Sequence, residues 1–246
     1  MTAGGDMKPI WIIKAGETLA DLARTHGDFE DWIAAGLAGG PLPVQVHDAR
    51  AGLPPAPDAM AGAIVTGSHA MVSERAAWSE ALAAWLRDAV AAECPVLGIC
   101  YGHQLLAHAL GGEVGYRPQG PDVGTVNVER YPAAQTDPLF GALPARFAAP
   151  MVHLQSVVRL PSTAVALAHH AQEPHAAFRV GPCAWGVQFH PEFSLPAVQA
   201  YVDHLAETLR QHGMDPASVR DALQPTPHAA ALLPAFADWA AARAAR

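Results

Sequence analysis

The junction at residues 95–109 constrains the fold more than any other part of the chain. The strand-length apolar run PVLGI leads into Cys100, which Gly98 and Gly102 bracket, and a helix-like segment begins directly afterwards. A strand that ends in G-x-C-x-G before a helix is the nucleophile-elbow arrangement, whose glycines let the strand and the helix approach closely. The turn also sets the thiol near the helix N-terminus, where the dipole favours a thiolate. We therefore predict that Cys100 is a nucleophile; the alternative is a small buried residue, as most free cysteines are.

Strand-length runs alternate with helix-length segments over the first half of the chain. Three further β-branched or aliphatic runs precede the junction, at residues 9–13, 44–48 and 61–67. The segment 75–93 carries apolar residues at spacings of three and four, which indicates an amphipathic helix. This alternation is typical of a parallel sheet covered by helices.

The pattern changes from Gly112 onward. Short apolar runs, closely spaced and broken by Pro, Gly and polar turns, indicate hairpins or a mixed extension of the sheet. Residues 195–213 predict one amphipathic helix, with a proline near its start and a glycine as its stop. We predict an α/β fold, a doubly wound, mostly parallel sheet flanked by helices with a β-rich extension. Residues 8–213 form the predicted domain, and residues 214–246 form an Ala- and Pro-rich helical tail.

Composition limits the classes of function. The 246 residues are 51% hydrophobic, which is enough for one large buried core. The net charge is −8 and the 15 Lys and Arg residues form no basic run, which argues against a nucleic-acid surface. The apolar runs are shorter than the ~20 residues of a membrane span, and residues 1–10 show no leader pattern. Three cysteines without a C-x-x-C pair suit a reducing compartment, so we expect a soluble, cytoplasmic protein.

A second stretch, AWGVQFHPEFS at residues 184–194, supplies the groups that a cysteine nucleophile needs. A strand-like run delivers His190, a proline follows, and Glu192 stands two positions on. A thiol needs a histidine to take its proton, and that histidine needs an acceptor at its other nitrogen to fix its tautomer. We predict that His190 is the base and that Glu192 orients it; alone, the stretch would read as a surface turn at a strand end.

Together the two stretches resemble the class I glutamine amidotransferases, a family of thiol enzymes with a Cys-His-Glu triad and a flavodoxin-like fold. GICYGHQ at residues 98–104 is similar to the G-x-C-x-G-x-Q elbow of that family, and GVQFHPE at residues 186–192 is similar to its second motif. The resemblance covers about residues 8–205. It implies that Cys100 attacks the side-chain amide of glutamine and that His190 protonates the departing ammonia. A γ-glutamyl thioester forms and is then cleaved by water.

The resemblance also implies which residues bind the substrate. The run IVTGS at residues 64–68 corresponds to the glycine loop whose backbone N–H completes the oxyanion hole, which assigns Gly67 and Tyr101 to that hole. Thr66 stands where the family often has glycine. Four further positions are implied to contact glutamine, namely Gln104, His153, Leu154 and Gln155. Gln155 replaces an aspartate that several members carry.

No metal or cofactor is expected. The chain has 13 histidines, and His169, His170 and His175 cluster in sequence, but no H-x-x-x-H or carboxylate spacing accompanies them. We interpret these three as surface or strand-end residues.

The chain carries no segment that resembles an ammonia acceptor, which leaves two hypotheses for the substrate. Either glutamine is hydrolysed for a separate ammonia-acceptor subunit, or the substrate is another γ-glutamyl compound whose amine is released by a γ-glutamyl peptidase or hydrolase. A redox or chaperone protein of flavodoxin-like fold with an elbow cysteine is a third, weaker hypothesis, because such proteins lack the His-Pro-Glu pair. A catalytically silent binding domain is a fourth.

Overall fold

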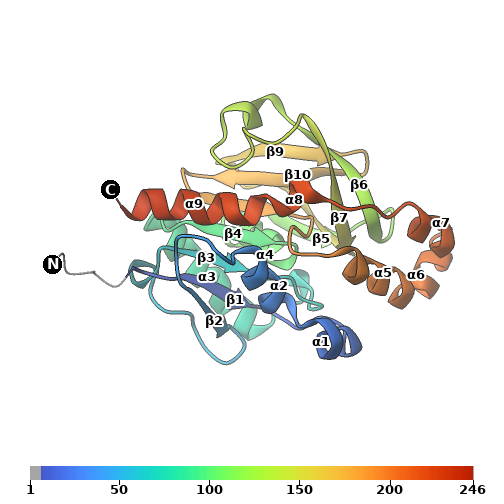
Figure 1. Cartoon of the computed structure of the whole chain (residues 1–246), viewed down its shortest axis with the longest axis horizontal. Coiled ribbons are helices and arrows are strands. Elements are labelled where there is room, and N and C mark those ends of the chain that lie inside the picture. The colour runs from blue at the N-terminus through green and yellow to red at the C-terminus, as the bar shows by residue number, and fades with distance from the viewer. Residues whose placement is uncertain (1–6, 246) are drawn as a thin grey trace.

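The computed structural model describes residues 7–245. The prediction made for residues 1–10, that they show no leader pattern, therefore falls largely outside the described residues. A nine-stranded sheet forms the centre of the molecule, in the order β2-β1-β3-β4-β11-β10-β9-β6-β7 (Figure 1). Its strands are β1 (Ile10–Lys14), β2 (Val44–Asp48), β3 (Gly62–Val65), β4 (Val96–Ile99), β6 (Asp122–Arg130), β7 (Arg146–His153), β9 (Ala164–His170), β10 (Glu173–Val180) and β11 (Ala184–Val187).

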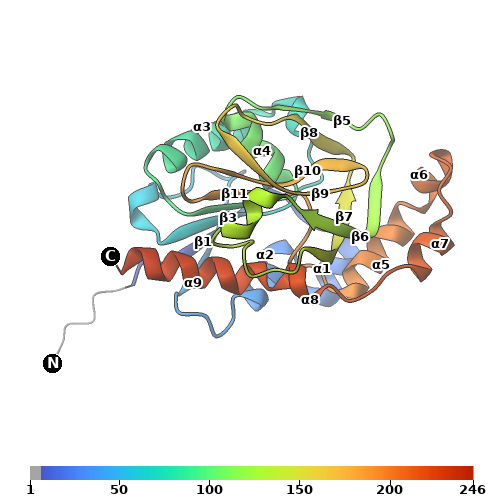
Figure 2. The ribbon, with the colours of Figure 1, turned by 90° about the horizontal axis from the view of Figure 1, so that it is seen from above.

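The first five strands of that order are parallel, and the central ones, β3, β4 and β11, are buried on both faces. Successive side chains alternate between the two faces, as a strand requires, so Ile12 and Ile13 belong to different core clusters. Helices α3 (Ala77–Ala91) and α4 (Tyr101–Ala109) cover the face of Ile13, while α2 (Phe29–Gly36) packs on the face of Ile12. The predicted doubly wound, mostly parallel sheet is confirmed, and Figure 2 shows helices on both of its sides.

The remaining strands of the large sheet, β10, β9, β6 and β7, pair antiparallel. A separate two-stranded ribbon joins β5 (Glu113–Tyr116) to β8 (Gln155–Arg159). The β-rich extension predicted beyond Gly112 is therefore confirmed as hairpins that widen the sheet. The turn between β7 and β8 comes back to the carboxyl ends of the parallel strands, which brings residues 152–155 beside Cys100.

The helix predicted over residues 195–213 is divided in the structure. It consists of α5 (Leu195–His204) and α6 (Ala206–Gln211), with Leu205 between them at φ −91° and ψ 8°. Backbone hydrogen bonds from Leu205 to Tyr201 and from Leu209 to Leu205 continue across the bend. Beyond the bend, Leu209 is buried against Val202 in a small apolar cluster of its own.

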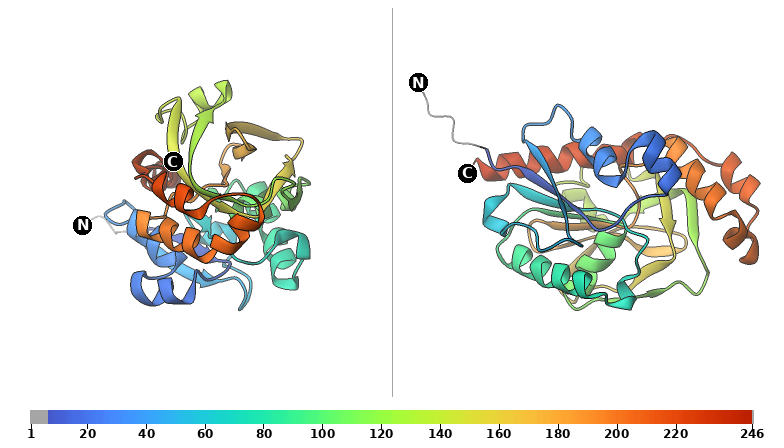
Figure 3. Two further views of the ribbon diagram at one scale, coloured as in Figure 1. Left: turned by 90° about the vertical axis from the view of Figure 1, so that its right-hand side faces the viewer. Right: turned by 90° about the horizontal axis from the view of Figure 1, so that it is seen from below.

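The C-terminal residues are helical, as α7 (Pro216–Asp221), α8 (Pro227–Ala230) and α9 (Leu232–Ala244). Helix α9 runs along the body of the protein (Figure 3), where Phe236 and Trp239 pack their rings 6.4 and 4.9 Å from that of Trp185. Phe236 therefore belongs to the main core cluster. A division of the chain at residue 213 stays a prediction. The short helix α1 (Ala20–His26) precedes α2, and no helix within residues 7–245 is long and apolar enough to cross a membrane.

Candidate active site

Cys100 lies at the sharp turn between β4 and α4. Its backbone has φ 51° and ψ −98°, a conformation that is strained for a residue with a side chain. The turn is tight enough to require both neighbouring glycines. A Cβ atom on Gly98 would lie 2.4 Å from the carbonyl oxygen of Gly102, and one on Gly102 would lie 2.5 Å from that of Val65. The G-x-C-x-G pattern thus has a steric cause, and it holds the sulfur at the carboxyl ends of the parallel strands.

His190 reaches the same edge because β11 pairs in parallel with β4, Val187 opposite Ile99. The residues after each strand therefore emerge side by side. The backbone N–H of His190 donates to Pro150 O at 3.0 Å, and its ring lies 3.9 Å from that of Phe193 in a stack. Its Nδ1 lies 2.8 Å from Glu192 Oε1, with both residues buried. The rigid turn through Pro191 thus lets the carboxylate hold the imidazole two residues before it.

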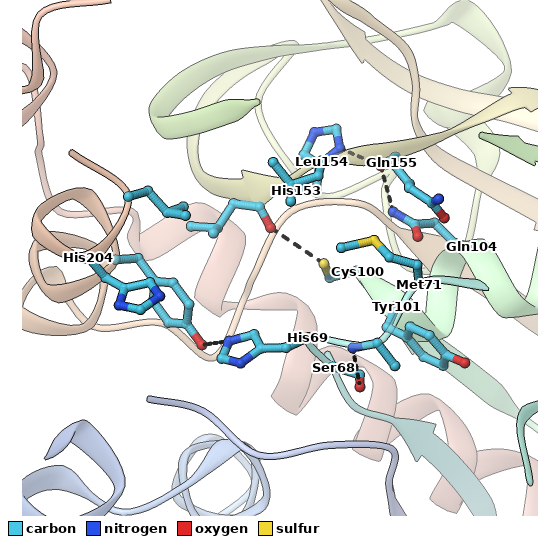
Figure 4. A pocket seen from close by; sticks show the side chains of 14 residues that line it. Ser68, His69, Met71, Cys100, Tyr101, Gln104, His153, Leu154, Gln155 and His204 are labelled. Carbon is cyan, nitrogen blue, oxygen red and sulfur yellow. Dashed lines mark hydrogen bonds between the residues drawn. The ribbon is translucent and has the colours of Figure 1, made fainter. Parts of the chain in front are cut away.

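The electrostatics of His190 favour its protonated form. Burial lowers the pKa of the imidazole, but the charges of Glu192 and Cys100 and hydrogen bonds with both outweigh burial and raise the pKa to about 10. A cationic imidazole beside the Cys100 sulfur stabilises a thiolate. The sulfur lies 3.6 Å from the carbonyl oxygen of Val152 and borders an open cavity (Figure 4). A cysteine sulfur beside an imidazolium suits nucleophilic attack on a carbonyl carbon.

The loop after β3 brings Gly67 against the triad. A Cβ atom at Gly67 would lie 3.3 Å from His190 Cε1, so a side chain there would crowd the ring. Thr66 fixes the loop, because its hydroxyl accepts from Ala15 N at 2.9 Å and donates to Gly67 O at 2.8 Å. The backbone N–H groups of Gly67 and Tyr101 donate to no acceptor within residues 7–245.

A cavity of about 280 Å³ opens over Cys100, and the four residues implied to bind substrate all line it. Gln104 is buried rather than exposed on its helix, and its Nε2 donates to Gln155 O at 2.7 Å and to Gln188 Oε1 at 3.0 Å. The side chain of Gln155 is held by Ser73, 2.5 Å from Nε2 to Oγ. Leu154 is half-buried at the wall of the cavity. These side chains therefore form a fixed wall on one side of the sulfur.

His153 is held from behind by a buried polar cluster. One ring nitrogen, Nδ1, lies 2.7 Å from Gln155 O, and Nε2 lies 3.4 Å from Asp122 Oδ2. Asp122 also lies 2.7 Å from His170 Nε2 and 3.7 Å from a guanidinium nitrogen of Arg117. The contacts with His153 and His170 outweigh burial and keep the pKa of Asp122 below its usual range. His153 thus joins the cavity lining to this buried cluster.

The structure places His169, His170 and His175 differently from one another. His170 is the last residue of β9, in line with the strand-end alternative, but its side chain is buried on Asp122; Asp122 lies 48 positions earlier, and the sequence does not connect the two. His175 binds the carbonyl oxygen of Val157 at 2.7 Å. In the described part of the chain, no group of three or more His, Cys, Asp or Glu residues could hold a metal ion.

Three residues that sequence reasoning missed line the other side of the cavity, namely His69, Tyr201 and His204. His69 directly follows the glycine loop, and this proximity is a signal that could have identified it. Tyr201 and His204 stand three positions apart on α5 and so share a face of that helix. Nothing in the sequence indicates that this face returns to Cys100.

Comparison with known proteins decides the family. Residues 48–203 match the sequence profile described as glutamine amidotransferase class-I. The chain belongs to this family. It is an α/β enzyme of the amidotransferase class, and the elbow cysteine with its His-Pro-Glu partners is typical of that class.

Relatives named as GMP synthases share the central part of the chain. A glutamine-hydrolysing GMP synthase of Aeropyrum pernix is 47% identical over 98 residues, which are 40% of this chain and 18% of that protein. In Ignicoccus hospitalis, a relative named as one subunit of a glutamine-hydrolysing GMP synthase is 41% identical over 100 residues, 40% of this chain and 50% of its own length. The matches therefore span a small part to about half of the curated relatives.

Solved structures agree over nearly the whole chain. A glutamine amidotransferase of Thermotoga maritima has a TM-score of 0.73 at 18% identity, covering 95% of this chain and 98% of its own. A glutamine amidotransferase of Methylobacillus flagellatus has a TM-score of 0.66 at 25% identity, covering 96% and 94%. The first likeness, at its low identity, is one of fold alone.

Proposed function

We propose that the protein hydrolyses a γ-glutamyl amide through a cysteinyl thioester. The Cys100 thiolate attacks the γ-carbonyl carbon, the C–N bond breaks, and the imidazolium of His190 gives its proton to the departing nitrogen. Water then attacks the thioester, His190 takes one proton of that water, and glutamate leaves as the thiolate is restored. Glu192 holds His190 in the tautomer that both steps need. The observation that carries this proposal is the buried Glu192–His190 pair, 2.8 Å long, beside the elbow cysteine.

The backbone N–H groups of Gly67 and Tyr101 are the proposed oxyanion hole. Both lie at the triad and neither donates to an acceptor within residues 7–245, so each is available to a developing negative charge. The wall formed by Gln104 and the loop 153–155 is the proposed contact surface for the glutamyl part of the substrate, in which the backbone of the loop meets the α-amino and α-carboxylate groups.

Two settings for this chemistry are supported by different observations. The relatives named as single subunits of glutamine-hydrolysing GMP synthases support glutamine as the substrate and a separate polypeptide as the ammonia acceptor. A γ-glutamyl peptidase or hydrolase is supported by the cavity, which continues past Cys100 to a second group of polar side chains that free glutamine does not require.

The test is glutamate release from glutamine by the purified chain, compared with the Cys100→Ser variant. Wild-type protein is expected to release glutamate without a partner, because both proposed oxyanion donors are free within residues 7–245, and one such donor contributes roughly 10²- to 10³-fold. The serine variant should release almost none. Equal release by both proteins would refute a thioester on Cys100.

A further inference from the structure

The direction in which the leaving group departs follows from the position of His190. The imidazole must protonate the departing nitrogen, so that nitrogen lies on the His190 side of Cys100 and the glutamyl chain extends away from it. The ring of His190 stacks on Phe193, which in turn stacks on Tyr201 at 5.3 Å. A leaving group protonated by His190 would therefore face the side of the site where the helix with Tyr201 lies.

That side of the cavity is lined by His69, Tyr201 and His204, which together we call the imidazole wall. Figure 4 shows Cys100 between two groups of side chains, with His69 and His204 on one side and Gln104 and Gln155 on the other. The two walls differ in chemistry and come from different elements. A substrate that carried only an NH₂ group on its γ-carbonyl would leave the imidazole wall uncontacted.

Hydrogen bonds and ring packing with residues farther from Cys100 hold the imidazole wall in place. His69 Nε2 lies 3.0 Å from the hydroxyl of Tyr201, which lies 2.9 Å from Thr18 Oγ1. The ring of His69 also packs edge-on against Phe29, 6.4 Å between centroids. His204 stands one turn after Tyr201 on the same face of α5 and is exposed at the cavity mouth.

In the described part of the chain, no unpaired carboxylate is seen to compete for the hydrogen-bond donors of this wall. None of the described residues that line the cavity is acidic. Asp28, a carboxylate near His69, is already bound by Lys14 Nζ at 2.9 Å and by the backbone of Thr18. Asp203, beside His204, is paired with Arg220. Burial, and then the charges of His204 and His190, lower the pKa of His69, so at neutral pH its ring is a neutral hydrogen-bonding group rather than a cation.

We propose that His69, Tyr201 and His204 form a leaving-group subsite for an amine that carries a carboxylate, so that the preferred substrate is a γ-glutamyl amino acid. This inference rests on the proposed γ-glutamyl hydrolysis and specifies its substrate. Cys100 displaces the amino acid from the γ-carbonyl, His190 gives the departing amino group its proton, and water releases glutamate from the thioester. The two imidazoles donate hydrogen bonds to the carboxylate.

Binding to the inactive Cys100→Ser protein tests the subsite without dependence on turnover. The ligands are γ-glutamylglycine and γ-glutamyl methylamide, which differ only by the carboxylate, and Kd is measured by calorimetry. γ-Glutamylglycine should bind roughly tenfold more tightly, the size of a hydrogen bond to a charged group. Adding His204→Gln or His69→Gln should reduce this preference several-fold. Adding His228→Gln, an exposed histidine on α8 outside the cavity, should leave it intact.

Equal Kd values for the two ligands, absence of binding by both, or a preference that survives both glutamine substitutions would each overturn the subsite. Thermal unfolding of every variant checks its fold, and Cys100→Ala replaces the serine variant if the latter is unfolded. The proposed function fails separately, when wild-type protein forms no Cys100 adduct with a glutamine-like chloroketone. A Cys100 adduct together with equal Kd values would retain the hydrolysis and remove the subsite.

Discussion

The Glu192→Gln variant isolates the electrostatic part of the triad. The amide oxygen of glutamine can still accept the hydrogen bond from His190 Nδ1, so the ring keeps its tautomer, but the charge that stabilises the imidazolium is lost. The bond is buried and 2.8 Å long, and a hydrogen bond between charged groups contributes about 1.5–3 kcal/mol, so kcat/KM should fall roughly 10- to 100-fold at neutral pH.

The pH profile carries the sharper prediction. In the wild-type protein His190 stays protonated up to its pKa of about 10, so activity should persist through pH 9 and be lost as pH rises through that value. Glutamine at position 192 removes a main cause of the raised pKa, while burial still lowers it, so the alkaline limb should move to lower pH. Glutamate release between pH 6 and 10.5 measures the limb, and Glu207→Gln, an exposed carboxylate on α6, is the matched control. Coincident alkaline limbs in wild type and Glu192→Gln would refute the ion-pair account.

Three further predictions concern other parts of the molecule. His190→Ala should lower kcat/KM roughly 10²- to 10⁴-fold, more than Glu192→Gln does, because it removes the proton carrier itself; similar glutamate release by the two variants would contradict this order. Cys94→Ser and Cys183→Ser should keep nearly full activity, because both thiols are buried at the amino ends of β4 and β11, opposite to Cys100; a loss beyond tenfold in either would contradict the assignment. Asp122→Asn should destabilise the fold by about 1–3 kcal/mol in denaturant unfolding and raise KM for the substrate, because it removes the charged partner of His170 behind the loop 153–155, while Arg117 keeps its buried pair with Glu173; unchanged unfolding would show that the cluster is dispensable.

The sequence predicted well what depends on neighbouring residues. The strands of the parallel half and the helix at 77–91 follow from local hydrophobic spacing, and the elbow follows from the steric need for glycine at Gly98 and Gly102. The Cys-His-Glu set was predictable because two motifs carry it, and the sheet then joins them through one parallel strand pair.

Contacts between distant parts of the chain were beyond sequence reasoning. Thr18 and Tyr201 meet across 183 positions, and Asp122 and His170 meet across 48, with no local pattern that marks either pair. The bend at Leu205 was missed because apolar spacing continues across it. These contacts build the imidazole wall of the cavity and support the loop 153–155. The sequence therefore did not reveal the residues proposed to bind the leaving group.

The most direct test of the central claim is to locate the acyl-accepting thiol. Protein treated with a glutamine-like chloroketone is digested, and the modified peptide is identified by mass spectrometry. The label should lie on Cys100 and be absent from the Cys100→Ser protein, since burial raises the pKa of Cys94 to about 12 and also raises that of Cys183. A label on Cys94 or Cys183, or a label that persists in Cys100→Ser, would contradict the account.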